Sequence, residues 1–218
     1  MNSFTEENYI KAIYHLSEGD KHVVSTNSIA ELTNTKASSV TDMLKKLAEK
    51  ELINYIKYQG VTLTQNGRST AINIIRKHRL WELFLVEKLQ FKWDEVHDIA
   101  EELEHIKSDE LVDRLEEFLG HPRVDPHGDL IPDKHGKFHK KDLIRVSKMQ
   151  AGDKGVISGV SEHSTKFLQY LEKTGLILGN KIMVQEIIEF DGSVILTLEH
   201  KEITISREAA KNILILMN

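Results

Sequence analysis

The stretch between residues 28 and 64 constrains the fold of this chain most, because its pattern predicts four elements in a fixed order. Apolar residues recur at helical spacing in a short segment, 28–32, and in a longer one, 37–49, with a polar turn between them. Two runs rich in β-branched and aromatic residues follow, joined at Gln59 and Gly60. Helix, turn, helix and hairpin in this order predict a winged helix-turn-helix, a fold that binds DNA.

The rest of the sequence predicts a mainly α protein with a β-rich C-terminal part. Ser3 and Glu6 have the spacing of a capping box, which predicts a first helix from about residue 4 to 17. Helical spacing continues through the middle of the chain, whereas residues 120–141 hold all three prolines and predict a loop. After residue 148, roughly five short strands and one helix predict a small SH3-like barrel. The expected domains are a winged helix-turn-helix domain at 1–72, a helical domain with its linker at 73–141 and an SH3-like domain at 148–218.

Composition limits the class of protein. The chain of 218 residues has a net charge of −5, which argues against a generally basic nucleic-acid binder. No apolar run reaches the roughly 18 residues of a membrane span, and the first residues lack a signal-peptide pattern, so a cytoplasmic location without membrane contact is expected. The absence of cysteine excludes disulfides and thiolate metal sites. Any metal must therefore be bound by imidazole nitrogen and by carboxylate or carbonyl oxygen, which suits manganese or ferrous iron.

Acidic residues and histidines concentrate in the same part of the chain. Residues 73–120 carry 13 Asp and Glu against 7 Lys and Arg, and seven of the eleven histidines lie between residues 78 and 139. A divalent cation would supply the missing positive charge there. These counts predict a metal site in the helical domain.

The stretch VHDIAEELEHI, residues 96–106, is the strongest candidate for this metal site. A helix over these residues has one apolar face, and its polar side chains share a second sector about 100° wide. Side chains at i, i+3 and i+4 can converge on one ion. On an isolated helix the alternative interpretation is a solvated polar face without a ligand. The polar sector comprises His97, Glu101, Glu104 and His105.

The order of these parts resembles the diphtheria-toxin-repressor family of metal-dependent transcriptional regulators. The resemblance rests on the winged helix, then RKHRLWELFLVEKL, then VHDIAEELEHIKSDELVDRLEEFLGHPRVDPHGDLIP, then a small β-domain. The resemblance is especially to the manganese-responsive branch, which has a C-terminal SH3-like (FeoA-like) domain. The resemblance implies a homodimer that binds a divalent metal and then double-stranded operator DNA, and that represses genes for metal uptake.

The resemblance also implies up to two metal sites in each subunit. Three positions depart from the family pattern: Asn8 stands where manganese regulators usually have Asp, Glu101 where iron-responsive members have Cys, and Asp125 where some relatives have Cys. Because no sulfur ligand remains, we expect Mn²⁺ as the activator, with Fe²⁺ as the alternative. The implied ligands are Glu101, Glu104, His105 and the first-helix residue Asn8 for the primary site, His78, Glu82 and His97 for the second site, and Asp125, His127 and His163 in the branch with the longer linker.

The second helix of the helix-turn-helix is expected to enter the major groove with its first turns. Small hydroxyl side chains there can bind phosphates or base edges, although at least one of them is expected to cap the helix. Lysines farther along supply charge that neutralises phosphates without regard to sequence. The predicted DNA-binding residues are Lys36, Ser38, Ser39, Thr41, Asp42, Lys45 and Lys46, with Gln59 at the tip of the wing.

Together these features predict a metal-activated DNA-binding regulator without enzymatic activity or a small organic substrate. We expect the acidic cluster to repel itself in the absence of metal, which would leave the first helix poorly docked and the DNA-binding heads disordered. A metallohydrolase is the enzymatic alternative, but the sequence has no His-Glu-x-x-His motif and no phosphate-binding loop. A winged-helix regulator that responds to an organic ligand is the other alternative.

Overall fold

The computed structural model describes residues 2–19, 22–139, 141–199 and 201–217. The chain divides into two compact units. One comprises Met1–His78, Glu101–Arg114 and Pro132–Lys137, and the other comprises Arg79–Ala100, Leu115–Ile131 and Phe138–Asn218. The predicted division into three domains remains a prediction, since the compact units cut through the helical segment.

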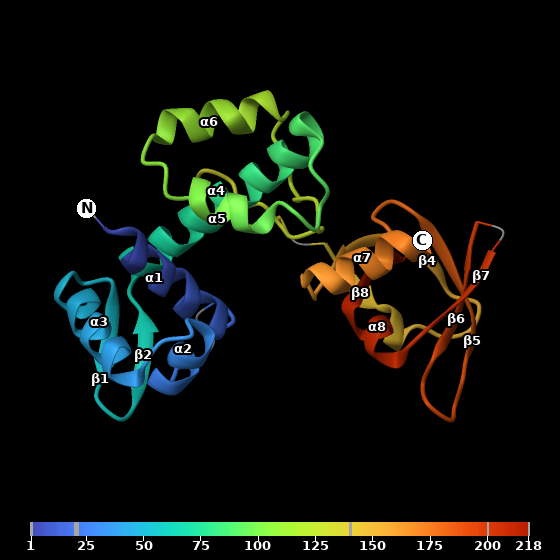
Figure 1. Cartoon of the computed structure of the whole chain (residues 1–218), viewed down its shortest axis with the longest axis horizontal. Helices are drawn as coiled ribbons and strands as arrows, with labels where there is room; N and C mark the ends of the chain where they lie inside the picture. Colours follow the sequence, from blue (N-terminus) through green and yellow to red (C-terminus); the bar gives the residue numbers. More distant parts are fainter. Residues whose placement is uncertain (1, 20–21, 140, 200, 218) are drawn as a thin grey trace. The chain divides into compact units, whose positions relative to one another are not determined.

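A winged helix-turn-helix begins the first unit, as predicted (Figure 1). Ser3 and Glu6 form the predicted capping box, in which the Glu6 amide donates to Ser3 Oγ at 3.3 Å and the Ser3 amide to Glu6 Oε2 at 2.8 Å. Apolar side chains from every element share one core that includes Ile10, Leu44 and Val61. The elements are α1 (Phe4–Leu16), α2 (Thr26–Leu32), α3 (Ala37–Glu49) and the antiparallel strands β1 (Ile53–Ile56) and β2 (Gly60–Leu63).

Three further helices follow the wing: α4 (Gln65–Leu89), α5 (His97–Leu103) and α6 (Asp109–Phe118). Helix α5 is shorter than predicted, because it ends at Leu103 and leaves Glu104 and His105 in a turn. The prediction of one continuous helix across residues 96–106 was therefore wrong at its C-terminal end. Lys77 Nζ donates to the carbonyl oxygen of Ile106 at 2.9 Å and so helps to hold the chain after this turn.

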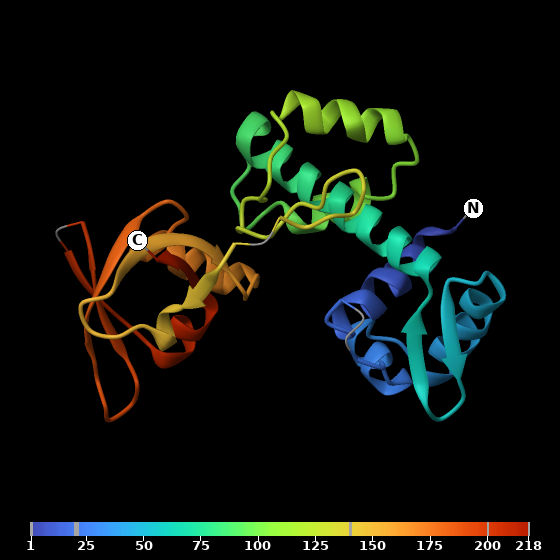
Figure 2. The same cartoon turned by 180° about the vertical axis from the view of Figure 1, so that it is seen from behind.

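The C-terminal part of the second unit is a six-stranded antiparallel sheet in the order β3-β8-β4-β5-β6-β7 (Figures 1 and 2). Its apolar core includes Leu168 and Leu171 of helix α7. Helix α7 corresponds to the one helix that the sequence predicted in this region. The sequence prediction missed β3, α8 and β8. The elements are β3 (Leu143–Arg145), the 3-10 turn η1 (Val146–Lys148), β4 (Lys154–Val160), α7 (Thr165–Thr174), β5 (Lys181–Ile187), β6 (Val194–Leu198), β7 (Lys201–Ile205), α8 (Arg207–Asn212) and β8 (Ile213–Met217).

Strand β8 was missed because it lies inside the sheet, between β3 and β4. Its sequence, ILILM, is continuously apolar and lacks the alternation that identifies a half-exposed strand. Among the described residues, none of the helices has the length and apolar character needed to cross a membrane.

Candidate metal centres and DNA-binding surface

A first cluster of charged side chains surrounds Glu104, just after helix α5. Glu104 is fully buried, and its Oε2 lies 2.7 Å from His78 Nδ1 of helix α4. Lys11 of helix α1 donates to both oxygens of Glu104, at 2.7 and 2.8 Å, and also forms an ion pair with Glu101. We call the residues Glu7, Lys11, His78, Glu101, Glu104 and His105 the first cluster.

His105, which lies in the turn after α5, also belongs to the first cluster. Its Nδ1 lies 2.6 Å from Glu7 Oε2, and its ring stacks on Phe4 with 4.6 Å between the ring centres. The predicted ligand Asn8 lies on the same helix, but its side chain is exposed. The first-helix carboxylate that reaches His105 is therefore Glu7, and ligation by Asn8 remains a prediction.

The position of Lys11 corrects the expected electrostatics of the cluster. We expected unneutralised carboxylates that repel each other and leave helix α1 poorly docked. Instead, the Lys11 ammonium contacts Glu101 and Glu104 and joins α1 to these residues. The polar pattern of residues 96–106 could not reveal this, because Lys11 is 93 residues away from Glu104 in the sequence.

A second cluster lies in the second unit around Glu82, Asp125 and His127. All three side chains are buried, and one ligand atom from each lies within 4.8 Å of the others. His127 Nε2 is 2.8 Å from the Trp93 carbonyl oxygen, while its Nδ1 faces Glu82 Oε2 at 3.6 Å. We call Glu82, His97, Asp125, His127, Asp129 and His163 the second cluster.

Burial and close charges perturb the protonation of this second cluster. Burial raises the pKa of Asp125 to about 7, and the neighbouring charges of Asp129 and Glu82 act in the same direction. Burial opposes the charged form of His127, but the Glu82 carboxylate overcomes this effect and raises the pKa of His127 to about 9. Ligand nitrogens and oxygens must be unprotonated, so cation binding here would release protons.

His97 and His163 lie at the margins of the second cluster. His97 Nδ1 is 3.5 Å from Glu82 Oε1. The His163 ring lies 5.1 Å from that of His127, and His163 Nε2 is 3.9 Å from Asp129 Oδ2. Burial lowers the pKa of His163 despite the nearby Asp129 carboxylate.

Close backbone packing holds the loop that carries Asp125 and His127. The Val160 amide of β4 donates to the His127 carbonyl oxygen at 3.0 Å. Gly128 has a φ of +87°, and a side chain there would lie 2.2 Å from the carbonyl oxygen of Ser158. Only glycine fits this approach, so the strand positions the loop. The sequence signal for this feature was the Asp-Pro-His-Gly turn.

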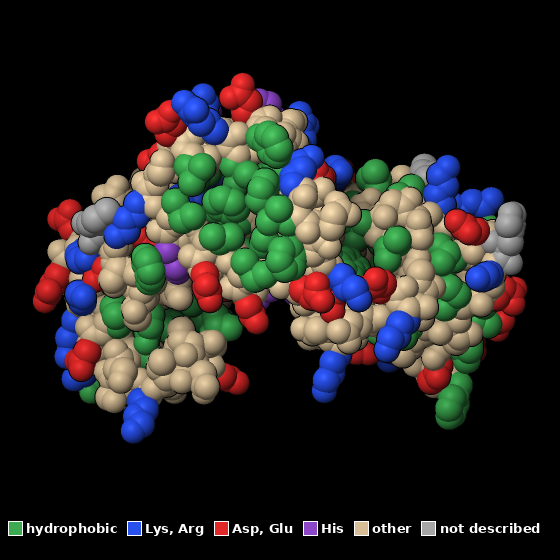
Figure 3. Space-filling model, turned by 45° about the horizontal axis from the view of Figure 1, so that its top comes forward, with side chains coloured by type: hydrophobic (Ala, Val, Ile, Leu, Met, Phe, Trp, Pro, Cys, Tyr) green, Lys and Arg blue, Asp and Glu red, His purple; other side chains and the backbone are tan. Residues whose placement is uncertain are grey.

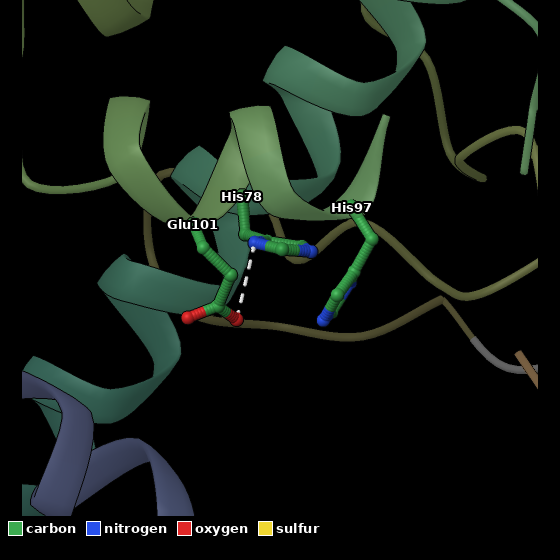
Figure 4. Close-up of side chains that lie close together, drawn as sticks. All are labelled: His78, His97 and Glu101. Carbon is green, nitrogen blue, oxygen red and sulfur yellow. Dashed lines mark ion pairs between the residues drawn. The ribbon is translucent and has the colours of Figure 1, made fainter. Parts of the chain in front are cut away.

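The predicted ligands His78, Glu82 and His97 each have carboxylate or imidazole neighbours. The resemblance assigns His78, Glu82 and His97 to one site. Glu82 lies near His97 and His127, and His78 contacts Glu104. Figure 4 shows His78 beside Glu101, with their ion pair of 3.9 Å, and His97 at the start of the helix that carries Glu101. The assignment of His78, Glu82 and His97 to one site remains a prediction.

Sequence reasoning missed four charged residues at these clusters: Glu7, Lys11, Arg79 and Asp129. Arg79 Nη2 donates to Asp129 Oδ2 at 3.2 Å, and Arg79 Nε lies 3.7 Å from Asp125 Oδ2. Arg79 neighbours His78 in the RKHR motif, and Asp129 follows the Asp-Pro-His-Gly turn, so their proximity in sequence to predicted ligands was an available signal. Nothing local identified Lys11.

The carboxylates and imidazoles of the first and second clusters fit a divalent cation that prefers oxygen and nitrogen ligands. Both clusters combine carboxylates with imidazoles at the distances given above, without sulfur. Manganese and ferrous iron accept such ligands. Such a cation would add positive charge beside the buried carboxylates Glu104, Glu82 and Asp125.

The N-terminal turns of α3 form an exposed surface, as its predicted role in DNA binding requires. Thr41 Oγ1 donates to the Ala37 carbonyl oxygen at 2.9 Å, so this hydroxyl is already used within the helix. Two lysines are also paired: Lys45 with Asp42 at 3.1 Å, and Lys46 with Glu6 at 2.9 Å. The exposed predicted residues are Lys36, Ser38, Ser39, Asp42, Lys45, Lys46 and Gln59, whereas Thr41 is half-buried.

An exposed apolar surface lies on the helices of the second unit. Figure 3 shows apolar side chains gathered on one face of the molecule. Leu89 is 53% exposed and Phe118 is 65% exposed, and the Phe118 ring lies 6.3 Å from that of Phe84. A contiguous exposed apolar patch is typical of a protein interface.

Three domain models of known families match successive parts of the chain. The DNA-binding domain model of iron dependent repressors matches residues 2–61, and the model of their metal binding and dimerisation domain matches residues 64–133. The FeoA domain model matches residues 144–216. The three matches follow one another along the chain without overlap.

Individual relatives agree with these domain models. A solved structure described as a manganese-dependent transcriptional repressor in complex with manganese is 34% identical, with a TM-score of 0.85 over 98% of this chain and 100% of that chain. An HTH-type transcriptional regulator of Methanocaldococcus jannaschii, itself uncharacterised, is 38% identical over 52% of this chain and 90% of the relative. The iron-dependent repressor IdeR of Mycobacterium tuberculosis is 27% identical over 94% of both chains. This chain therefore belongs to the family of metal-dependent transcriptional repressors that includes the diphtheria toxin repressor.

Proposed function

We propose that this protein is a cytoplasmic, homodimeric repressor that binds double-stranded operator DNA when Mn²⁺ is bound at two sites in each subunit. The observation that carries the proposal is the buried group of Glu82, Asp125 and His127, whose ligand atoms lie within 4.8 Å of one another. Oxygen and imidazole donors accept manganese without the sulfur that favours softer ions. The similarity to a manganese-dependent repressor across nearly the whole chain supports the same assignment.

The first cluster is proposed as the activating site because it includes residues of the DNA-binding part. Glu101, Glu104, His105 and His78 would hold the cation there, with Asn8 as a further predicted ligand. Glu7 of α1 already contacts His105, so the same helix contributes to the cluster and to the winged-helix core. Cation binding would then favour one orientation of α1 and of the recognition helix α3 packed in the same core.

The second cluster is proposed as a supporting site. Glu82, Asp125 and His127 would provide its ligands, with His97 and His163 at its margins. Asp125 and His127 belong to a loop that is bonded to strand β4. Binding there would therefore stabilise the loop against the C-terminal sheet.

Operator binding measured with different cations tests this proposal. We would select duplexes from a random-sequence library with the protein in Mn²⁺, and then titrate the selected duplex by fluorescence anisotropy. Mn²⁺ is expected to activate binding, anaerobic Fe²⁺ to do so more weakly, and chelator to abolish it.

Two other outcomes would reject parts of the proposal. Full activation by Fe²⁺ or Zn²⁺ while Mn²⁺ fails would reject manganese and favour the iron-responsive alternative, which the similarity to IdeR supports. DNA binding that is unchanged in chelator would reject metal activation itself and favour a regulator with an organic ligand.

A further inference from the structure

Lys11 occupies the position in the first cluster where positive charge is needed. Its side chain is only 12% exposed and its ammonium contacts the fully buried Glu104. Both oxygens of Glu104 accept hydrogen bonds from this one group, and Oε2 also faces His78 Nδ1 at 2.7 Å. Lys11 is in addition paired with Glu101.

Such an ammonium and a divalent cation would compete for the same carboxylates. A carboxylate oxygen that accepts a short hydrogen bond from an ammonium has a lone pair engaged, and the fixed positive charge repels an incoming cation. Lys11 has a long, flexible side chain that can withdraw, but withdrawal breaks its bonds to Glu101 and Glu104. Breaking the bonds from Lys11 to Glu101 and Glu104 costs free energy, and this cost makes cation binding weaker.

We propose that Lys11 is an internal cation that holds helix α1 to Glu101 and Glu104 in the cation-free protein and sets the Mn²⁺ concentration at which the first cluster fills. This inference rests on the proposed assignment of the first cluster as a Mn²⁺ site. It assigns to Lys11 two opposite effects. Lys11 stabilises the protein without Mn²⁺ and weakens the binding of Mn²⁺.

The variant Lys11→Met tests both effects, because methionine keeps an unbranched side chain of similar length without the charge. We expect its melting temperature in chelator to fall, since Glu101 and Glu104 lose their counter-charge. In calorimetric titration with MnCl₂ we expect Mn²⁺ to bind at least about tenfold more tightly than to the wild type. Lys11→Arg keeps the charge and should retain the weaker affinity of the wild type. Lys173→Met, at an exposed position of α7, is the matched control and should change neither measurement.

The outcomes separate this inference from the proposed function. A folded Lys11→Met protein whose Mn²⁺ affinity is unchanged or weaker would overturn the role of Lys11, and Lys11→Gln provides the same comparison if the Met variant does not fold. Glu104→Gln is titrated in parallel. If it binds as many Mn²⁺ ions as the wild type, the first cluster is not a Mn²⁺ site and the proposed assignment fails. The effect of Lys11→Met on the melting temperature in chelator would still report whether the ammonium stabilises the cation-free protein.

Discussion

At the scale of single residues, Glu104 shows how burial changes the meaning of a polar pattern. The sequence suggested a solvated acidic face as the alternative to a ligand, but Glu104 is fully buried between Lys11 and His78. A buried carboxylate is stable only if it is paired and hydrogen-bonded, and removing one partner leaves the other charges uncompensated. Glu104 is therefore important for stability as well as for the proposed cation site.

The isosteric change Glu104→Gln should abolish Mn²⁺-dependent DNA binding. The amide keeps the volume of the side chain but loses the charge that pairs with Lys11 and would attract a cation. We also expect a loss of about 2 to 4 kcal/mol in the unfolding free energy of the cation-free protein. Anisotropy titration of the selected duplex and urea unfolding in EDTA measure the two effects. Glu102 is exposed, so Glu102→Gln is the control. Equal effects of the two variants on DNA binding and on unfolding would contradict the assignment of Glu104 to the cation site.

At the scale of elements, helix α1 connects the first cluster to the recognition helix. Glu7 and Lys11 contact the cluster, whereas Glu6 pairs with Lys46 at 2.9 Å and with Lys50 at 2.7 Å. Lys46 belongs to α3, and Lys50 ends that helix. One short helix therefore carries ion pairs to both the candidate cation site and the DNA-binding element.

The ion pairs of Glu6 should make the stability of the winged helix depend on acid. Burial alone would raise the pKa of Glu6, but Lys50, the Ser3 amide and Lys46 outweigh it and lower the pKa from 4.5 to about 2. Because the folded-state pKa is depressed, the stabilisation is complete above about pH 4.5 and is lost as the pH falls toward 2. Glu6→Gln keeps a residue that can form the capping box and removes the charge.

We therefore expect Glu6→Gln to reduce the unfolding free energy by about 2 kcal/mol at pH 7 and by progressively less below pH 4.5. Urea unfolding at pH 7, 4.5 and 3 measures the difference from the wild type. Glu49→Gln, at an exposed position near the end of α3, is the matched control. A difference between Glu6→Gln and the wild type that stays constant from pH 7 to pH 3 would contradict this account.

Helix α3 should contain residues with separate roles in affinity and in base selection. Lys45 is exposed and offers charge to phosphates, whereas Ser39 lies in the first turn and can reach base edges. Lys45→Ala is expected to weaken binding to all duplexes and to reduce the salt slope by about 1, while Ser39→Ala should mainly change sequence preference. Salt titrations with the selected duplex and a random duplex distinguish the two effects. If both variants lose affinity equally on both duplexes, the recognition helix is wrongly placed.

At the scale of the whole molecule, the exposed apolar surface around Leu89 and Phe118 is the expected dimer interface. The family model that matches residues 64–133 describes a metal binding and dimerisation domain. Burying apolar side chains between two copies would contribute roughly 25 cal/mol for each Å² removed from water. A dimer would present two recognition helices to two half-sites of an operator.

The substitution Phe118→Asp should dissociate the dimer, because a carboxylate cannot be buried without a partner in an apolar interface. We expect a monomer in sedimentation velocity experiments at micromolar concentration. Operator affinity should fall by about 100-fold, since the second half-site no longer binds within the same complex. Phe190 is 98% exposed in the C-terminal part of the chain, so Phe190→Asp is the control. A Phe118→Asp protein that remains dimeric would place the interface elsewhere.

The sequence by itself determined the elements whose signals are local. The bounds of α3 agree with the predicted ones because its apolar residues keep a strict helical period, and α1 starts at the predicted capping box. The absence of cysteine also limits any candidate metal ligands to oxygen and nitrogen donors. The helix signals depend only on residues that are close in the chain, and the donor types depend only on composition.

Only the tertiary structure decided which charged groups meet. His78 and Glu82 lie one turn apart on α4, and residues from distant parts of the chain approach them. Glu104 reaches His78 from the turn after Leu103, and His127 faces Glu82 from the loop that is bonded to β4. Lys11 joins the first cluster from 93 residues away. Contacts of this kind depend on how helices pack and where the chain turns, which helical periodicity does not encode. The sequence therefore limited the types of candidate ligand, and the fold grouped these side chains and added an ammonium among the carboxylates.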